Sequence, residues 1–278
     1  MPTYETPEPI TAILEFDIAH VRLAAGKRTD TVVEVVPSNP SDDNDNRAAQ
    51  QTKVTYANGT LTLKGPRKRS VFGRVGSVDV TVELPAGSQL QAHSSMGDFS
   101  CQGPLGESRF RSGLGDIRLD ETGPVVVRTD HGDVRVDRVV GDADINGQGR
   151  IDLGEVTGEL TLKNGIGDTT IGTVVGELRA KVSMGRVTVG VAESSVDIRT
   201  SQGSIQVNEV ARGRAELRTS LGAVEVGIRE STAAWLDVTA KVGVVRNSLG
   251  AAEGPGDAAE TVEVHAGTGA GDIVIRRA

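Results

Sequence analysis

The chain has 278 residues and a formal net charge of −8 at pH 7. It contains 35 Gly but only four Phe, two Tyr and one Trp, which argues against a globular core centred on aromatic side chains. Only 10 Pro and no Gly at every third position exclude collagen, and the single Cys excludes an intramolecular disulfide.

The N-terminal segment gives the first expectation about location. A secretion signal has a basic segment followed by an apolar stretch. Residues 1–14 do not have this pattern. No apolar run in the chain approaches the ~18 residues of a transmembrane helix. The sequence therefore predicts a cytoplasmic protein without membrane insertion, and its acidic charge predicts no nucleic-acid partner.

Residues 1–90 read as strands without a repeating signature. Asn58-Gly59 is a strong signal for a two-residue hairpin, and the Asp/Asn-rich stretch 38–51 predicts a loop or one short helical turn. We expect these residues to cap a repetitive structure, because such structures expose strand edges at their ends. The expected strands are 12–23, 31–36, 53–56, 60–64 and 77–84.

A basic segment, KGPRKRSVFGR, lies between the last two of these strands. It is a candidate docking loop for an anionic partner, and the alternative is a solvated hairpin loop with no binding role. Its cations are Lys64, Arg67, Lys68, Arg69 and Arg74.

From residue 91 onward the chain repeats. A Gly recurs with seven consecutive spacings of 17 to 19 residues and two longer ones. After each Gly comes a pair of alternating apolar residues such as Val134/Val136, and a second pair such as Leu160/Leu162 precedes the next Gly. The recurring residues are Gly97, Gly115, Gly132, Gly149, Gly167, Gly185, Gly203, Gly222, Gly243 and Gly271.

A unit of about 18 residues with two short strands cannot close its own core, so successive units must stack. The sequence thus predicts an all-β, single-domain β-solenoid of about ten coils. Residues 1–90 would form the N-terminal cap and lead-in, and residues 91–278 the repeats with a C-terminal cap. The narrow interior explains the scarcity of aromatic residues, and the tight corners explain the abundance of Gly. We expect 261–264 and 272–276 to form the last coil, with Arg276 and Arg277 as charged guards on its exposed edge.

Gly-Asp dipeptides are the most tempting chemical feature. Aspartates follow the recurring Gly at Asp98, Asp116, Asp133, Asp168 and Asp272. However, Arg150 and Arg186 occupy the same column and would repel a calcium ion, so we expect each Asp to bind backbone amides at its corner.

No catalytic constellation emerges from the remaining residues. The four His, at positions 20, 93, 131 and 265, have no metal-ligand spacing, and we expect them on exposed strand faces or turns. No neighbour of Cys101 activates its thiol, so a buried or inert thiol is expected. The expectation is therefore no catalytic residue, no metal and no cofactor. The least favoured alternative is an enzyme whose groove carries the carboxylates of Asp116, Asp133 and Asp168.

The phrase VELPAGS at Val82 to Ser88, followed by repeated Ser/Thr-x-x-Gly-Asp-Ile/Val units, resembles the bacterial DUF4097 family of adhesin-like β-strand-repeat proteins. The resemblance covers nearly the whole chain. It implies a right-handed β-solenoid and supplies no catalytic residues.

Two functions are favoured over the enzymatic alternative. The first is a non-enzymatic cytoplasmic scaffold or protein-binding module, which binds another protein or a copy of itself. The second is a surface adhesin or carbohydrate-binding β-helix.

Overall fold

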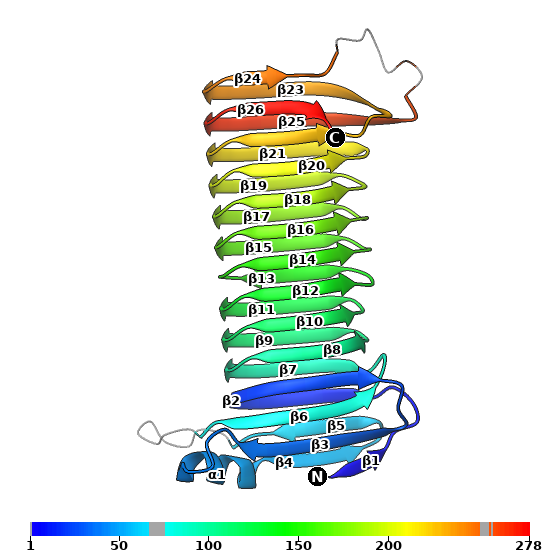
Figure 1. Ribbon diagram of the computed structural model, residues 1–278, viewed down its shortest axis with the longest axis vertical. Coiled ribbons are helices and arrows are strands. Elements are labelled where there is room, and N and C mark those ends of the chain that lie inside the picture. Colours follow the sequence, from blue (N-terminus) through cyan, green and yellow to red (C-terminus); the bar gives the residue numbers. More distant parts are fainter. Residues whose placement is uncertain (1, 67–75, 251–255, 257) are drawn as a thin grey trace. The chain divides into compact units, whose positions relative to one another are not determined.

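A computed structural model describes residues 2–66, 76–250, 256 and 258–278 of the chain. Within these residues there are 26 strands and one nine-residue helix, so the protein is all-β as predicted. The chain divides into two compact units, Met1–Val140 and Gly141–Ala278. Each unit is a stack of coils in which parallel strands pair from one coil to the next, which confirms the β-solenoid (Figure 1).

The first unit contains the helix α1 and strands β1 to β12. Their bounds are β1 Thr3–Glu5, β2 Thr11–Gly26, β3 Asp30–Pro37, α1 Asp43–Gln51, β4 Lys53–Ala57, β5 Thr60–Lys64, β6 Val78–Pro85, β7 Gln89–Met96, β8 Phe99–Leu105, β9 Ser108–Leu114, β10 Ile117–Thr122, β11 Val125–His131 and β12 Val134–Val139. All five strands predicted before residue 90 are present, with ends shifted by up to three residues.

Strand β2 runs through the interior of the first stack. Its first half pairs in parallel with β5 on one side and β7 on the other, and its second half pairs with β6 and β8. Leu14 and Ala19 in β2 are fully buried. The segment 11–26 is therefore a whole coil inserted between two coils that follow it in sequence.

Antiparallel strands and α1 close the N-terminal end of this stack. Strand β3 pairs antiparallel with β6, β4 with β5, and β1 with β3. The turn at Asn58-Gly59 has φ of 50° and 71°, so the predicted hairpin is confirmed. The stretch 38–51 departs from the prediction because Asp42 caps a regular helix, accepting a hydrogen bond of 2.7 Å from the Asn44 amide.

The second unit contains strands β13 to β26. They are β13 Ala143–Gly147, β14 Ile151–Val156, β15 Leu160–Ile166, β16 Thr169–Val174, β17 Leu178–Met184, β18 Val187–Ala192, β19 Val196–Gln202, β20 Ile205–Val210, β21 Gly213–Leu221, β22 Val224–Ile228, β23 Thr232–Val242, β24 Val245–Asn247, β25 Glu260–Ala270 and β26 Ile273–Arg277. We call the sheet of β13, β15, β17, β19, β21, β25 and β23 sheet B, and the sheet of the other strands sheet A.

The C-terminal segment does not form the last coil of this stack, and that prediction was wrong. Strand β25 pairs with β21 on one side and β23 on the other, while β26 pairs with β22 and β24. The outermost coil is therefore β23–β24, as Figure 1 shows in orange beyond the red strands. Spacing along the chain predicts the units but carries no information on the order in which they stack.

Arg276 and Arg277 consequently do not guard an edge. Arg276 Nε lies 2.8 Å from Glu225 Oε1, and Arg277 Nη1 donates hydrogen bonds to the carbonyls of Arg229 and Thr232. Both side chains link their own coil to residues of neighbouring coils.

Each coil turns at its recurring Gly, as the repeat predicted. All ten have φ between 127° and 151°. At Gly222, an added Cβ would lie 2.2 Å from the carbonyl oxygen of Gly203 in the coil below, so the stacked backbones leave no room for a side chain.

Apolar residues between the corners fill the interior. The predicted aliphatic pairs are buried, with Val134, Val136, Leu160 and Leu162 each at most 1% exposed. Leu236 and Val238 are half-exposed instead, because β23 belongs to the outermost coil. The predicted division at residue 90 and the right-handed winding stay predictions.

Candidate binding surface on the second unit

The Gly-Asp corners have the structural role that the sequence predicted. Asp98 Oδ1 accepts a hydrogen bond of 2.8 Å from the amide of Asp116, and Asp116 Oδ1 accepts one of 3.0 Å from Asp133. In the second unit, Asp168 binds the Arg186 amide and Asp272 binds the Val244 amide, each at 2.9 Å. These carboxylates fasten one coil to the next.

The remaining predicted candidates have structural surroundings. Cys101 is buried, and desolvation, with a smaller contribution from Asp120, raises the pKa of its thiol far above the ordinary value. Of the predicted basic segment, Lys64 ends β5 with its Nζ 3.2 Å from Glu15 Oε2. Arg67, Lys68, Arg69 and Arg74 lie outside the described residues, so the docking-loop prediction stays a prediction.

A column of four cations runs along the outer surface of sheet B in the second unit. Lys163 on β15 is in register with Lys181 on β17, Lys181 with Arg199 on β19, and Arg199 with Arg218 on β21. All four side chains are exposed. Parallel strands lie about 4.8 Å apart, so the four rungs span roughly 14 Å. We call these residues the basic ladder.

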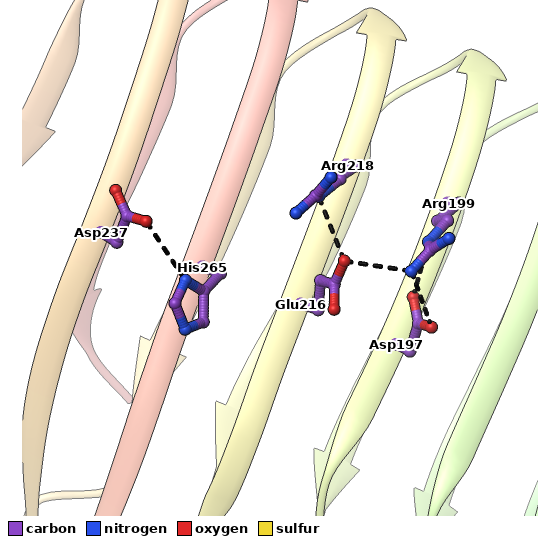
Figure 2. Close-up of polar contacts among 6 residues, drawn as sticks. All are labelled: Asp197, Arg199, Glu216, Arg218, Asp237 and His265. Carbon is purple, nitrogen blue, oxygen red and sulfur yellow. Dashed lines mark hydrogen bonds and ion pairs between the residues drawn. The ribbon is translucent and has the colours of Figure 1, made fainter.

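Carboxylates neutralise one half of the basic ladder only. Arg199 Nη2 and Arg218 Nε converge on Glu216 Oε1 at 3.0 Å and 3.2 Å, and Arg199 Nε lies 3.1 Å from Asp197 Oδ1. Figure 2 shows both guanidinium groups turned toward these carboxylates. In the part of the chain that the structure describes, Lys163 and Lys181 have no ion pair, so their ammonium groups remain available to a ligand.

A shallow depression of about 200 Å³ lies at the unpaired half of the basic ladder. Its lining includes Lys163, Lys181 and Arg199, with Arg179 and Asp197 from the neighbouring column. Arg179 forms ion pairs with Glu177 and Glu159. The depression thus gathers cationic groups on a surface of a chain whose net charge is negative.

His265 occupies a second polar cluster on the same sheet. Its Nδ1 lies 3.3 Å from Asp237 Oδ2 and its Nε2 lies 2.9 Å from Glu263 Oε1, while its ring centroid is 5.4 Å from that of Trp235. The His265 side chain is only 17% exposed, in contrast to the exposed strand face expected from sequence. This cluster joins the outermost strand β23 to β25 (Figure 2).

Directly after β22, Arg229 links three coils. Its guanidinium makes two hydrogen bonds of 2.8 and 2.9 Å to Glu193 and a third contact to Glu209. The hydrogen bonds from Arg229 lower the pKa of Glu193. These contacts hold the coils in register and pair the charge of Arg229 with those of Glu193 and Glu209.

Among the described residues, no group of three or more His, Cys, Asp and Glu side chains is placed to hold a metal ion. In the same residues, no helix is long and apolar enough to cross a bilayer.

Sequence comparison identifies the family. The DUF4097 profile, described as Toastrack, matches residues 13–276. The chain belongs to the DUF4097 family. The match covers both units, as the VELPAGS phrase and the repeated Gly corners predicted. No curated protein matches this Toastrack chain by sequence.

Solved structures are similar to this Toastrack chain at low identity. One is a candidate adhesin from Bacteroides fragilis, with 13% identity, coverage of 99% of this chain and 95% of that chain, and a TM-score of 0.43. A second is a candidate cell adhesion protein from Clostridium sporogenes, with 12% identity, coverage of 100% and 98%, and a TM-score of 0.25. A third candidate adhesin, from Parabacteroides merdae, has 13% identity, coverage of 99% and 95%, and a TM-score of 0.36.

The basic ladder of this Toastrack chain was missed by sequence reasoning. Its four cations are spaced by 18, 18 and 19 residues, the same intervals as the recurring Gly. Applying the repeat period to the polar positions as well as the apolar ones would have found it.

Proposed function

We propose that the protein is a non-enzymatic protein-binding module that holds an acidic segment of a partner protein on the basic ladder. The observation that carries this proposal is the register of Lys163, Lys181, Arg199 and Arg218 on one exposed sheet face, with two ammonium groups left unpaired. A stacked sheet fixes the strand positions before binding, so little backbone entropy is lost when the partner docks.

The mixed charges of this surface favour a protein segment over a nucleic acid. Asp197 and Glu216 lie among the cations and would repel a continuous row of phosphates. A peptide can place carboxylates opposite Lys163 and Lys181 and other groups opposite the neutralised half. The net charge of −8 adds to the repulsion of nucleic acid.

Two observations support a non-enzymatic role. At the corners, Asp116 and Asp168 each accept a hydrogen bond through one carboxylate oxygen from a backbone amide of the next coil. The Cys101 thiol is buried, and its raised pKa disfavours the nucleophilic thiolate. The proposal keeps the cytoplasmic location that the sequence predicts, and cell fractionation tests it.

A carbohydrate-binding or adhesive role is the second candidate. It is favoured by Trp235, which is 58% exposed on the outer coil beside His265. An exposed indole is a typical platform for a sugar ring. Recovery of the protein on the cell surface, together with loss of glycan binding in Trp235→Ala, would replace the first proposal by this one.

The experiment measures binding of a fluorescent Glu-rich peptide by anisotropy. We expect the double variant Lys163→Glu/Lys181→Glu to bind at least about tenfold more weakly, a loss of roughly 1.4 kcal/mol. Binding of the wild type should also weaken with added salt, because the charges are exposed.

The matched control is Lys27→Glu/Lys53→Glu, which makes the same change in net charge at exposed positions in the first unit. It should bind like the wild type. Equal losses in both double variants would show a nonspecific charge effect and contradict the proposal. So would tighter binding of duplex DNA or a sulfated glycan than of the peptide.

A further inference from the structure

The second unit ends in a coil whose outer edge is unpaired. Strand β23 pairs with β25 and β24 pairs with β26, and no described strand pairs with the opposite side of either. In a parallel ladder, alternate residues direct their N–H and C=O groups to each side of the strand. Half of these groups along the 11 residues of β23 therefore face outward without a strand partner.

Apolar surface accompanies this edge. Leu236, Val238 and Ala240 point to the inner side of β23 and are half-exposed. Their partners one coil below, Val264, Ala266 and Thr268, are buried. The next coil that would cover them is absent among the described residues. A further pair of strands placed on this edge would bury these side chains and complete the backbone ladder.

The outward side chains of β23 indicate which strand can pair with its free edge. Asp237, Thr239 and Lys241 alternate along the exposed face, and Lys241 has no ion pair in the described part of the chain. In an antiparallel pairing of β23 with itself centred on Thr239, Asp237 comes opposite Lys241 of the second copy, and Lys241 opposite its Asp237. The same register places Val238 opposite Ala240 on the inner side. The edge is therefore complementary in charge to its own two-fold copy.

We propose that two copies of the chain associate through β23, antiparallel and centred on Thr239. A two-fold contact of this kind is closed, because each copy pairs its β23 edge with the β23 edge of the other. The proposal goes beyond the binding function above, since it uses no residue of the basic ladder. Lysine commonly protects a free strand edge from pairing. Here Lys241 instead forms an ion pair with Asp237 of the second copy.

Charge substitution tests the register. We expect the wild-type full-length chain to show a concentration-dependent monomer–dimer equilibrium in sedimentation velocity. Lys241→Glu places Glu opposite Asp237 at two symmetric positions and should leave monomer only. The exchange Asp237→Lys/Lys241→Glu restores opposite charges at both positions and should restore the dimer.

A cysteine on the two-fold axis gives a second measurement. Thr239→Cys lies opposite its own copy, so mild oxidation should give a covalent dimer, while the native Cys101 is buried and does not compete. Ser183→Cys, at an exposed position on β17, is the matched control and should crosslink far less. Circular dichroism establishes that each variant is folded.

A wild type that remains monomeric at every concentration would overturn the proposal. So would a Lys241→Glu variant that dimerises like the wild type, or an exchange variant that remains monomeric. These outcomes are independent of peptide binding. Lys241→Glu should bind the acidic peptide normally, and Lys163→Glu/Lys181→Glu should dimerise normally, so failure of either proposal is recognised separately.

Discussion

The beginning of the first unit and the end of the second are built by the same device but finished differently. At both, a coil near the chain terminus is inserted between two coils that lie nearer in sequence to each other: β2 between β5–β6 and β7–β8, and β25–β26 between β21–β22 and β23–β24. The first unit then closes its end with antiparallel strands and α1, whereas the second leaves β23–β24 open. Insertion therefore buries β2 and β25–β26 inside their stacks. Antiparallel strands close the end of the first unit, and no described strand does so in the second.

The largest expected effect comes from the inserted coil of the second unit. Ile275→Ala removes a fully buried side chain that lies between β22 and β24, and it should lower the free energy of unfolding by about 2–5 kcal/mol. Urea denaturation measures the change. The control Val245→Ala, on the open coil and 43% exposed, should cost less than about 1 kcal/mol. If both variants lost the same stability, the C-terminal coil would not lie inside the stack.

The corner column should show the next largest effect. At Gly222→Ala the φ of 147° alone costs about 1–3 kcal/mol, and the contact with the Gly203 carbonyl adds to it. Thermal unfolding should show a lower midpoint. Gly267→Ala is the control on neighbouring β25, where an added Cβ meets only one atom, at 4.0 Å. A normal midpoint in Gly222→Ala would mean that the coils can separate at this corner.

A smaller loss is expected at the closed end of the first unit. Gly59→Ala keeps free space around the new Cβ but places Ala at φ 71°, so the β4–β5 hairpin should lose about 1 kcal/mol. Hydrogen exchange of the β4 amides measures this local loss. Gly26→Ala, also in open space but without positive φ, is the control and should leave exchange unchanged. Equal protection in both variants would contradict the strain at the turn.

The smallest effect is electrostatic and depends on pH. Because Arg229 lowers the pKa of Glu193 in the folded chain, this pair stabilises the fold above the ordinary Glu pKa and is lost as pH falls through the lowered value. Arg229→Met should therefore be less stable than the wild type at neutral pH, with a difference that narrows in acid. Solvent screening keeps the difference small.

Thermal midpoints across this pH range test the Arg229 prediction. Lys181→Met, which removes a cation without a carboxylate partner, is the control and should show no such narrowing. A difference between Arg229→Met and wild type that stays constant into acid would contradict the linkage to Glu193.

The repeat made the coil predictable from sequence, because apolar alternation and Gly corners act within about 18 residues. The core positions of Val134 and Leu160 were predicted correctly. So was the hydrogen bond between Asp98 and a backbone amide at its corner. The stacking order could not be predicted, since Ile275 and Val245 both read as ordinary strand residues. What separates them is which coil lies on each side, and that depends on contacts far apart in sequence.

The basic ladder was not predicted from the sequence for a different reason. Lys163 and Lys181 are unremarkable one at a time, and they become a site only when strand register aligns them. The basic segment that begins at Lys64 is recognisable in the sequence because its cations are close together along the chain. In a solenoid, adjacency in space follows the repeat period, so charge patterns should be counted at that period.

The insertion of β25–β26 also bears on the timing of synthesis. A ribosome completes β23–β24 before β25–β26, the strands on which that coil rests, so β23 can reach its place in the stack only after β25–β26 have emerged. We therefore expect the proposed pairing between two copies through β23 to follow the synthesis of β25–β26.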